Sequence, residues 1–240
     1  MASCSHREGV LVSFGPMCEP GEAIGGVIFD MDGVLCDSER FICEAACRMF
    51  AELHAVNVAP EDFVPFVGAG ENRYLGGVAE KHGVTLDLER DKARTYEIYL
   101  QIIKGRLDPL PGCREFIAAC RRRGMKLAVA TSADRVKMVG NLTELKLPPE
   151  TFDVCVNGLD VARKKPDPEI FLLAAGRLGL PPARCLVVED APNGVRAAKA
   201  AGCRCLALTT SFEAAALREA GADHLAEDLA HVPRRVFRGG

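Results

Sequence analysis

The sequence has little of what marks a membrane, secreted or nucleic-acid-binding protein. No apolar stretch in its 240 residues reaches the roughly 18 to 20 residues that a membrane-spanning helix needs. The start, MASCSHREG, lacks the basic-then-apolar order of a secretory signal. A formal net charge of -3 and a pI near 6.0 give no global basic field of the kind that nucleic-acid-binding proteins carry. We therefore expect a soluble intracellular protein without a nucleic-acid or membrane partner.

The cysteines also lack a metal-binding or disulfide pattern. There are 11 of them, but no Cys-x-x-Cys pair and no histidine at the spacing of a zinc ligand. Most lie within apolar patterns such as FICEAAC and FIAAC, and Cys203 and Cys205 alternate on one expected strand. We therefore expect them to be small buried apolar side chains in a reducing compartment.

Five apolar runs of strand length are separated by helical patterns. Each run is nearly continuous, as in strands that are covered on both faces in a parallel sheet. With 48% apolar residues, the chain can bury a substantial centre. The pattern predicts an α/β fold with a parallel sheet. The expected strands are 26–29, 126–131, 153–157, 185–190 and 203–209.

The segment between the first and second expected strands contains no convincing strand. Such a helical insertion predicts a second, smaller domain. We expect an N-terminal lead-in at 1–24, a core formed by 25–38 and 107–240, and an all-helical cap at 39–106. The helices expected in the cap lie at about 39–53, 60–67, 72–82 and 86–103.

Polar side chains stand at or just beyond the carboxyl ends of four expected strands, which is where an open parallel sheet binds its ligands. Several carboxylates in one cleft need a hard divalent cation, and oxygen ligands suit Mg²⁺. A lysine adds a fixed positive charge, while hydroxyl groups and the peptide NH groups of a helix start are donors to an anion. Together they predict a phosphoryl site. These residues are Asp30 and Asp32, Thr131 and Ser132, Lys165, and Glu189 and Asp190.

The two aspartates after the first strand suit two different roles. A carboxylate such as Asp30 can attack phosphorus and form an aspartyl-phosphate. Asp32 can give the leaving alcohol its proton and later take one from the attacking water. Read alone, the pair also fits a solvated turn or the metal clamp of a glycosyltransferase. An EF-hand loop is disfavoured, because such a loop needs glycine at its sixth position and Gly33 is the fourth residue counted from Asp30.

Four motifs occur in order along the chain: DMDGVLCDS, ATSAD, KKPDPEIF and VVEDAPNGVRAAKAAG. Together they resemble the haloacid dehalogenase superfamily of phosphohydrolases, over about residues 25–232. The resemblance implies a doubly wound, Rossmann-like sheet of order 5-4-1-2-3 with a helical cap. It implies that Asp30 is the nucleophile and Asp32 the acid/base. Implied ligands of Mg²⁺ are Asp30, the carbonyl of Asp32, and Asp190 with Glu189 in support, and implied phosphate ligands are Thr131, Ser132 and Lys165.

Within this superfamily, the chain resembles the branch that contains beta-phosphoglucomutase and phosphoglycolate phosphatase. A mutase of that branch carries a histidine near the position of Ile42 and a lysine near that of Tyr99, and both are absent here. Asp32 favours phosphate esters over halides, because a leaving alcohol needs a proton. The stretches FVGAGENRYLGGVA and RLDPLPG resemble the phosphatase-like domain of a plant chloroplast protein. The expected compartment is therefore either the cytoplasm or an organelle interior such as the chloroplast stroma.

The sequence thus predicts a Mg²⁺-dependent phosphatase that hydrolyses small phosphorylated metabolites, either sugar or organic-acid phosphates. The cap loop at 68–73 is expected to face the site, where Glu71, Asn72 and Arg73 select the substrate. The alternatives are a phosphosugar mutase and a regulatory module that acts through a partner. We expect a monomer or a weak homo-oligomer.

Overall fold

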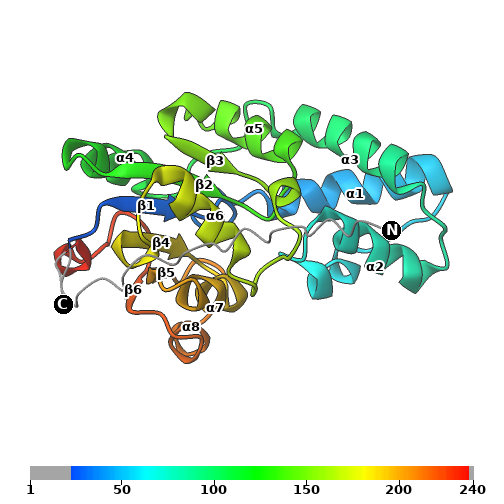
Figure 1. The fold of residues 1–240 in the computed structure, drawn as a ribbon. Helices are drawn as coiled ribbons and strands as arrows, with labels where there is room; N and C mark the ends of the chain where they lie inside the picture. The colour runs from blue at the N-terminus through cyan, green and yellow to red at the C-terminus, as the bar shows by residue number, and fades with distance from the viewer. Residues whose placement is uncertain (1–22, 238–240) are drawn as a thin grey trace, which may run out of the picture.

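The computed structural model describes residues 23–237, and its centre is a six-stranded parallel sheet (Figure 1). The spatial order is β3-β2-β1-β4-β5-β6. The chain therefore winds outward from β1 in both directions, and a crevice opens at the carboxyl ends of β1 and its neighbour β4. The strands are β1 (Gly26–Phe29), β2 (Lys126–Ala130), β3 (Val154–Val156), β4 (Cys185–Glu189), β5 (Arg204–Leu208) and β6 (His224–Ala226).

The predicted fold class is confirmed, with one correction to the sheet. Five strands have the expected relative order, but β6 extends the sheet beyond β5 and was not predicted. β6 is three residues long and opens with His224, so it lacks the apolar run that marks the other strands. Residues 1–22 of the expected lead-in lie outside the described part of the chain.

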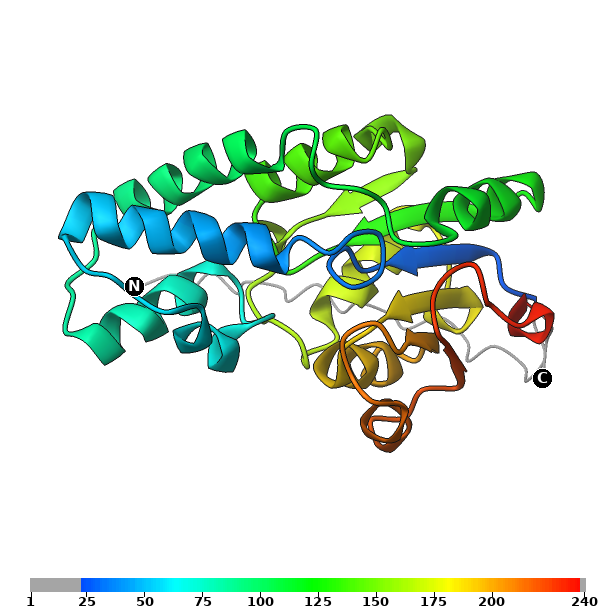
Figure 2. The same cartoon turned by 180° about the vertical axis from the view of Figure 1, so that it is seen from behind.

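Helices cover both faces of the sheet, and a second group lies beyond the carboxyl ends of the strands (Figures 1 and 2). No helix in residues 23–237 is both long and apolar enough to span a bilayer. The helices that accompany the sheet are α4 (Cys113–Arg122), α5 (Arg135–Glu144), α6 (Glu169–Leu178), α7 (Pro192–Ala200) and α8 (Ala214–Glu219). The second group consists of α1 (Glu39–His54), α2 (Glu71–His82) and α3 (Leu88–Ile103).

The strands are buried on both sides because their side chains alternate between two apolar clusters. Val27 and Phe29 of β1 belong to the cluster that contains Phe116 of α4. Ile28 belongs to the cluster that contains Phe171 of α6. This period of two, with every residue of β1 buried, explains the continuous apolar runs in the sequence.

The helical insertion packs around α1 and α3, which lie side by side. α1 buries Phe41, Ile42, Ala45 and Met49, which share one helical face. The side chain of Asp87 accepts a hydrogen bond from the backbone N–H of Arg90 and so caps the start of α3. The segment expected as one helix at 60–67 instead forms two 3₁₀ turns, Pro60–Asp62 and Val64–Phe66, each with proline in its first turn.

Two connecting segments, one leading into the insertion and one leading out of it, and one helix contact join the insertion to the core. The two segments are hydrogen-bonded to each other, since the backbone N–H of Leu110 donates to the carbonyl of Leu35 at 2.9 Å. α3 packs on α5, where the hydroxyl of Tyr99 donates to Oδ1 of Asn141. We propose that residues 39–106 act as a cap that forms the roof over the carboxyl ends of the strands.

Candidate active site

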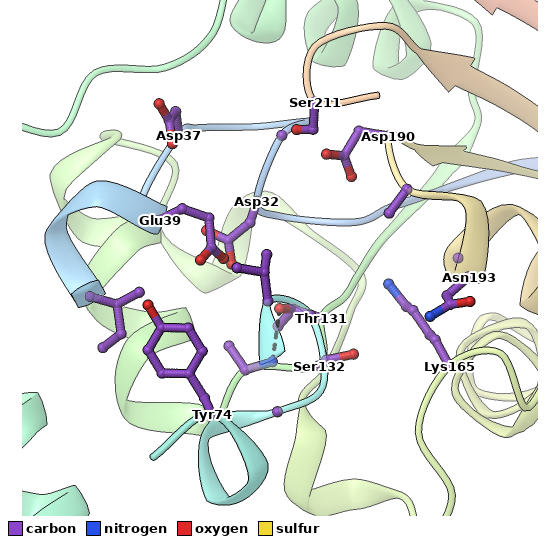
Figure 3. Close-up of a pocket in the computed structure, with 18 of the residues that line it drawn as sticks. Asp32, Asp37, Glu39, Tyr74, Thr131, Ser132, Lys165, Asp190, Asn193 and Ser211 are labelled. Carbon is purple, nitrogen blue, oxygen red and sulfur yellow. Dashed lines mark hydrogen bonds between the residues drawn. The ribbon is translucent and has the colours of Figure 1, made fainter. Parts of the chain in front are cut away.

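Polar side chains converge at the carboxyl edge of the sheet, in a cavity of about 760 Å³ (Figure 3). The loops after β1, β2 and β4 form one side of the cavity, and residues of α1 and α2 form the other. Six of the residues predicted from the sequence line this cavity. They are Asp32, Glu71, Thr131, Ser132, Lys165 and Asp190.

Lys165 joins Asp30 to Glu189. Its Nζ lies 2.7 Å from a carboxylate oxygen of each. Burial raises the pKa of Asp30 to about 7, although the positive charge of Lys165 opposes this rise. Burial alone would lower the pKa of Lys165, but the two carboxylates outweigh it and raise that pKa. Lys165 therefore stays positively charged at neutral pH, beside the carboxylate predicted to be the nucleophile.

Glu189 is held by the start of α7 as well as by Lys165. Its Oε2 accepts hydrogen bonds from the backbone N–H groups of Asp190 at 3.0 Å and Ala191 at 3.1 Å. A Cβ at Gly194 would overlap the Glu189 carboxylate, so α7 needs glycine at this close approach. With both oxygens engaged, Glu189 orients Lys165 and the loop that carries Asp190.

Asp190 lies next to Asp30 and completes an acidic group. Three carboxylate oxygens lie within 4.8 Å of one another, one from each of Asp30, Glu189 and Asp190. Burial, and then the negative charges of Glu189 and Asp30, raise the pKa of Asp190 well above its ordinary value. A Cβ at Gly33 would overlap the Asp190 carboxylate, and Gly33 has a φ of 74°, so both space and backbone conformation require glycine there.

This acidic group fits a divalent cation. A hard cation such as Mg²⁺ prefers carboxylate and carbonyl oxygens, and it would offset the repulsion between the buried carboxylates of Asp30 and Asp190. Because Glu189 already binds Lys165 and two backbone N–H groups, it suits a supporting position better than a direct ligand. Asp30 and Asp190 are therefore the side chains best placed to hold the ion.

Asp32 has two partners that the sequence analysis missed. Ser38 donates a hydrogen bond to its Oδ1, and Nζ of Lys137 lies 2.9 Å from its Oδ2. Burial alone would lower the pKa of Lys137, but Asp32 and then Glu39 outweigh it and raise that pKa. In the sequence, Lys137 stands beside Met138 on the face of α5 that is buried, and a charged residue on such a face was the available signal.

Thr131 and Ser132 follow β2 and lie between the two charged groups. In Figure 3, Thr131 stands between Asp32 on one side and Lys165 on the other. Its Oγ1 accepts a hydrogen bond from the backbone N–H of Ala133, which fixes the turn. The backbone of Gly158 lies against the carbonyl of Ser132, where a Cβ would overlap it. This loop is therefore held rigidly at the place where the phosphate is expected.

The three residues predicted in the cap loop do not behave alike. Glu71 is buried and lines the cavity. Asn72 and Arg73 are exposed and lie outside the cavity lining, with Asn72 accepting a hydrogen bond from Lys92 and Arg73 paired with Glu80. A role for Asn72 and Arg73 in selecting the substrate stays a prediction. The cap also contributes Glu39 and Tyr74, which had not been predicted as site residues.

Comparison with known proteins identifies the family. A family model described as a haloacid dehalogenase-like hydrolase matches residues 24–202. The chain is 36% identical over 215 residues to a phosphorylated carbohydrates phosphatase of Thermotoga maritima, which covers 88% of this chain and 99% of that protein. The crystal structure of CbbY from Rhodobacter sphaeroides in complex with phosphate is similar, with a TM-score of 0.78, 30% identity, and coverage of 86% and 95%.

A plant protein is also similar over most of this chain. The chloroplastic protein SUPPRESSOR OF QUENCHING 1 of Arabidopsis thaliana is 42% identical over 221 residues. The match covers 90% of this chain but only 21% of that protein, so the chain spans about a fifth of the plant relative.

The chain belongs to the haloacid dehalogenase-like hydrolases. It is a phosphatase-like hydrolase of the branch that includes CbbY, beta-phosphoglucomutase and phosphoglycolate phosphatase, as its motifs predicted.

Proposed function

We propose that the protein is a Mg²⁺-dependent phosphatase that hydrolyses small phosphorylated metabolites, sugar phosphates in particular. The observation that carries this proposal is the arrangement of Lys165 between Asp30 and Glu189, with Asp190 beside them. It supplies a nucleophile, a fixed cation and the side chains of a metal site beside the cavity, which Lys165 and Asp190 line. Such groups stabilise the charge on the oxygens of a phosphoryl group during transfer.

The residues divide the reaction into two steps. Asp30 attacks phosphorus, the bond from phosphorus to the ester oxygen breaks, and Asp32 gives its proton to the departing alcohol. Water then attacks phosphorus of the aspartyl-phosphate and passes a proton to Asp32, the bond from the Asp30 oxygen to phosphorus breaks, and phosphate is released. Mg²⁺, held by Asp30, Asp190 and the carbonyl of Asp32, would supply positive charge to the phosphoryl oxygens. Lys165 and the loop at Thr131 bind the same oxygens.

The relatives support a phosphorylated carbohydrate as substrate. Besides the Thermotoga enzyme, a hexitol phosphatase of Escherichia coli is 32% identical over 200 residues, which cover 81% of this chain. A validoxylamine A 7'-phosphate phosphatase of Streptomyces hygroscopicus is 33% identical over 206 residues. The plant relative is chloroplastic by name, which supports an organelle interior as one compartment for this chain.

The mutase alternative finds less support. Ile42 lines the cavity where the resemblance to the mutases expects a histidine. Tyr99, near the expected lysine, is buried and bonded to Asn141. Isoleucine can neither bind an anion nor move a proton, and the hydroxyl of Tyr99 is already bonded to Asn141. We therefore favour hydrolysis, and expect free phosphate and no isomerised sugar phosphate as product.

Phosphate release tests the proposal. The wild-type protein and its Asp30→Asn variant are incubated with Mg²⁺ and a panel of sugar phosphates, together with p-nitrophenyl phosphate. The wild type should release phosphate, and Asp30→Asn should fall to background because an amide cannot attack phosphorus as a carboxylate does. Equal release by the two proteins would refute the assignment of Asp30, and no release by the wild type from any substrate would refute the phosphatase.

A further inference from the structure

Two partly buried thiols lie one helical turn apart on α1. Cys43 and Cys47 are four residues apart, so their side chains share one face of the helix. Both are free thiols, and both are only partly buried against the apolar cluster that contains Phe116. Most other cysteines in residues 23–237 are buried. The pair therefore forms a cluster of two nucleophilic groups in the helical insertion, which the phosphoryl site does not use.

The sulfur of Cys43 has two hydrogen-bond donors beside it, the thiol of Cys47 and the hydroxyl of Tyr74. The bond from Cys47, together with that from Tyr74, outweighs burial and lowers the pKa of Cys43 to about 7. The negative charges of Glu39 and Glu61 oppose this shift without cancelling it. The bond between the two thiols, and then burial, raise the pKa of Cys47, so Cys47 keeps its proton. At pH 7 about half of Cys43 is thus thiolate, the form of cysteine that attacks an electrophile.

Cys155 on β3 provides a matched thiol in the same chain. Its Sγ lies 3.9 Å from the carbonyl oxygen of Pro149, just as Sγ of Cys43 lies 3.9 Å from that of Pro60. Both cysteines are partly buried. Burial, and then the negative charge of Glu150, raise the pKa of Cys155. A difference in reactivity between the two thiols therefore measures what the donors around Cys43 add.

Tyr74 connects Cys43 to the cavity. Its side chain lines the cavity, and in Figure 3 its hydroxyl end points toward the helix that begins at Glu39. The ring is buried and packs on Phe63, with ring centroids 4.8 Å apart. An oxygen atom added to Sγ of Cys43 would occupy the space between the sulfur and the Tyr74 hydroxyl. Since the ring is enclosed, the added atom would displace part of the cavity wall.

We propose that Cys43 is a site of reversible oxidation by hydroperoxides, where Cys47 and Tyr74 stabilise the thiolate and through which oxidation reaches the wall of the cavity. The thiolate sulfur attacks one oxygen of the hydroperoxide, an S–O bond forms and the O–O bond breaks. The departing hydroxide or alkoxide takes a proton from water. Sulfur is oxidised by two electrons to a sulfenic acid, and the hydroperoxide is reduced.

The helix determines that the product is a sulfenic acid and not a disulfide. Residues four apart on a helix have Cβ atoms about 5 to 6 Å apart. A disulfide needs Cβ atoms about 3.5 to 4.5 Å apart. Joining Cys43 to Cys47 would therefore distort α1, which packs along α3. Cys47 acts as a hydrogen-bond donor to the thiolate and not as a resolving thiol.

Site-resolved labelling tests the proposal. The wild-type protein is incubated at pH 7 with hydrogen peroxide and dimedone, which traps sulfenic acids, and the labelled residues are identified by mass spectrometry. Cys43 should be labelled roughly 5-fold or more faster than Cys155, because its larger thiolate fraction outweighs the lower nucleophilicity of a low-pKa thiol. Equal rates at the two cysteines would overturn the proposal. A disulfide between Cys43 and Cys47 would overturn the proposed product.

Cys47→Ala removes the first donor and leaves Cys43 in place. It should slow the labelling of Cys43 at pH 7 roughly 5-fold and raise the pH at which the labelling rate is half-maximal. Cys155 should keep its wild-type rate in the same digest, which is the internal control. Thermal unfolding establishes that the variant is folded. An unchanged labelling rate of Cys43 in Cys47→Ala would overturn the role of the thiol pair.

The effect on the cavity rests on the proposed phosphatase function and is measured separately. Hydrogen peroxide should lower the kcat of the wild type for a sugar phosphate roughly 10-fold or more, as for a displacement of about 1 Å at the site. Dithiothreitol should restore it by reducing the sulfenic acid, and Cys43→Ala should keep its activity in peroxide. Equal losses in the two proteins would overturn the link between Cys43 and the cavity. If the wild type releases phosphate from no substrate, the phosphatase fails, and the labelling still decides the oxidation site.

Discussion

Nζ of Lys137 lies 2.9 Å from Oδ2 of Asp32, although 105 residues separate the two in the sequence. Ser38 holds the other oxygen of the same carboxylate. Asp32 is thus fixed by one partner from α5 and one from the chain that enters α1. A general acid and base must be held at a defined position relative to the atoms between which it moves protons. Lys137 is therefore expected to matter for turnover without contacting phosphorus.

Replacing Lys137 with methionine should slow the reaction through Asp32. We expect kcat for a sugar phosphate to fall roughly 10- to 100-fold, because Asp32 loses the cation that orients it. Lys137→Arg should recover part of the loss, since it keeps the charge, and Lys104→Met at an exposed position should have no effect. Steady-state kinetics with the three variants makes the comparison. Equal rates for Lys137→Met and the wild type would remove Lys137 from the mechanism.

Asp32→Asn should separate the two chemical steps. With a sugar phosphate, turnover should fall roughly 100-fold or more, the usual scale for loss of an acid/base. With p-nitrophenyl phosphate, the first step needs no proton, because p-nitrophenolate is a good leaving group. Stopped-flow absorbance should therefore show a burst of about one p-nitrophenolate per enzyme. Slow turnover should follow, because hydrolysis of the aspartyl-phosphate lacks its general base. If Asp32→Asn kept the wild-type rate with both substrates, a group other than Asp32 would have to move the proton.

Removing the metal should abolish activity reversibly. Excess EDTA is expected to stop phosphate release, and excess Mg²⁺ to restore it, because the buried carboxylates of Asp30 and Asp190 need a cation to bind a phosphate dianion. Asp190→Asn should raise the Mg²⁺ concentration for half-maximal activity roughly 10-fold or more. A titration of activity against Mg²⁺ measures this. Full activity in EDTA would contradict the assignment of this acidic group as a metal site.

Gly158→Ala should impair the site by pushing on the loop after β2. Its new Cβ would overlap the carbonyl oxygen of Ser132 and crowd Nζ of Lys164. We expect kcat/KM to fall roughly 10- to 100-fold, as for a misplacement of about 1 Å at a reacting group. Gly176→Ala is the control, because a Cβ there would meet no atom within 4 Å apart from the backbone of its own helix. In the interior of α6 it should stabilise the protein by about 0.5 to 1 kcal/mol with unchanged activity.

Asp62 should contribute stability that depends on pH. Hydrogen bonds from Lys81, His82 and the backbone N–H of Ala59 hold its pKa well below the usual 3.8. A depressed pKa stabilises the folded state at pH values above 3.8, and this contribution is lost as the pH falls below that value. Asp62→Asn should therefore lower Tm at pH 7, and its difference from the wild type should shrink in acid. The exposed Glu61→Gln should lack this trend, and a difference independent of pH would contradict the account.

The sequence alone predicted the parallel strands of the sheet and the part of the site that contains Lys165 and its neighbouring carboxylates. Near-continuous apolar runs mark buried parallel strands, and the residues that follow them must meet at one edge of the sheet. This logic brought Asp30, Lys165 and Asp190 together before any coordinates. It failed at β6, because three residues are too few to show an apolar run. It also failed at the cap loop, where the local sequence does not say which of several adjacent polar residues is buried.

Only the tertiary structure decided the rest. Lys137 and Ser38 carry no motif of their own, and their contact with Asp32 depends on how α5 and the crossing into α1 pack together. The burial of Glu71 at the cavity depends on how α2 packs there against α3. The strands themselves follow from the short-range periodicity of apolar residues, and their spatial order was implied by the resemblance to the family. The walls of the cavity come from contacts between segments far apart in the chain. For this reason the chemistry was readable in the sequence, and the contacts that hold Asp32 in place were not.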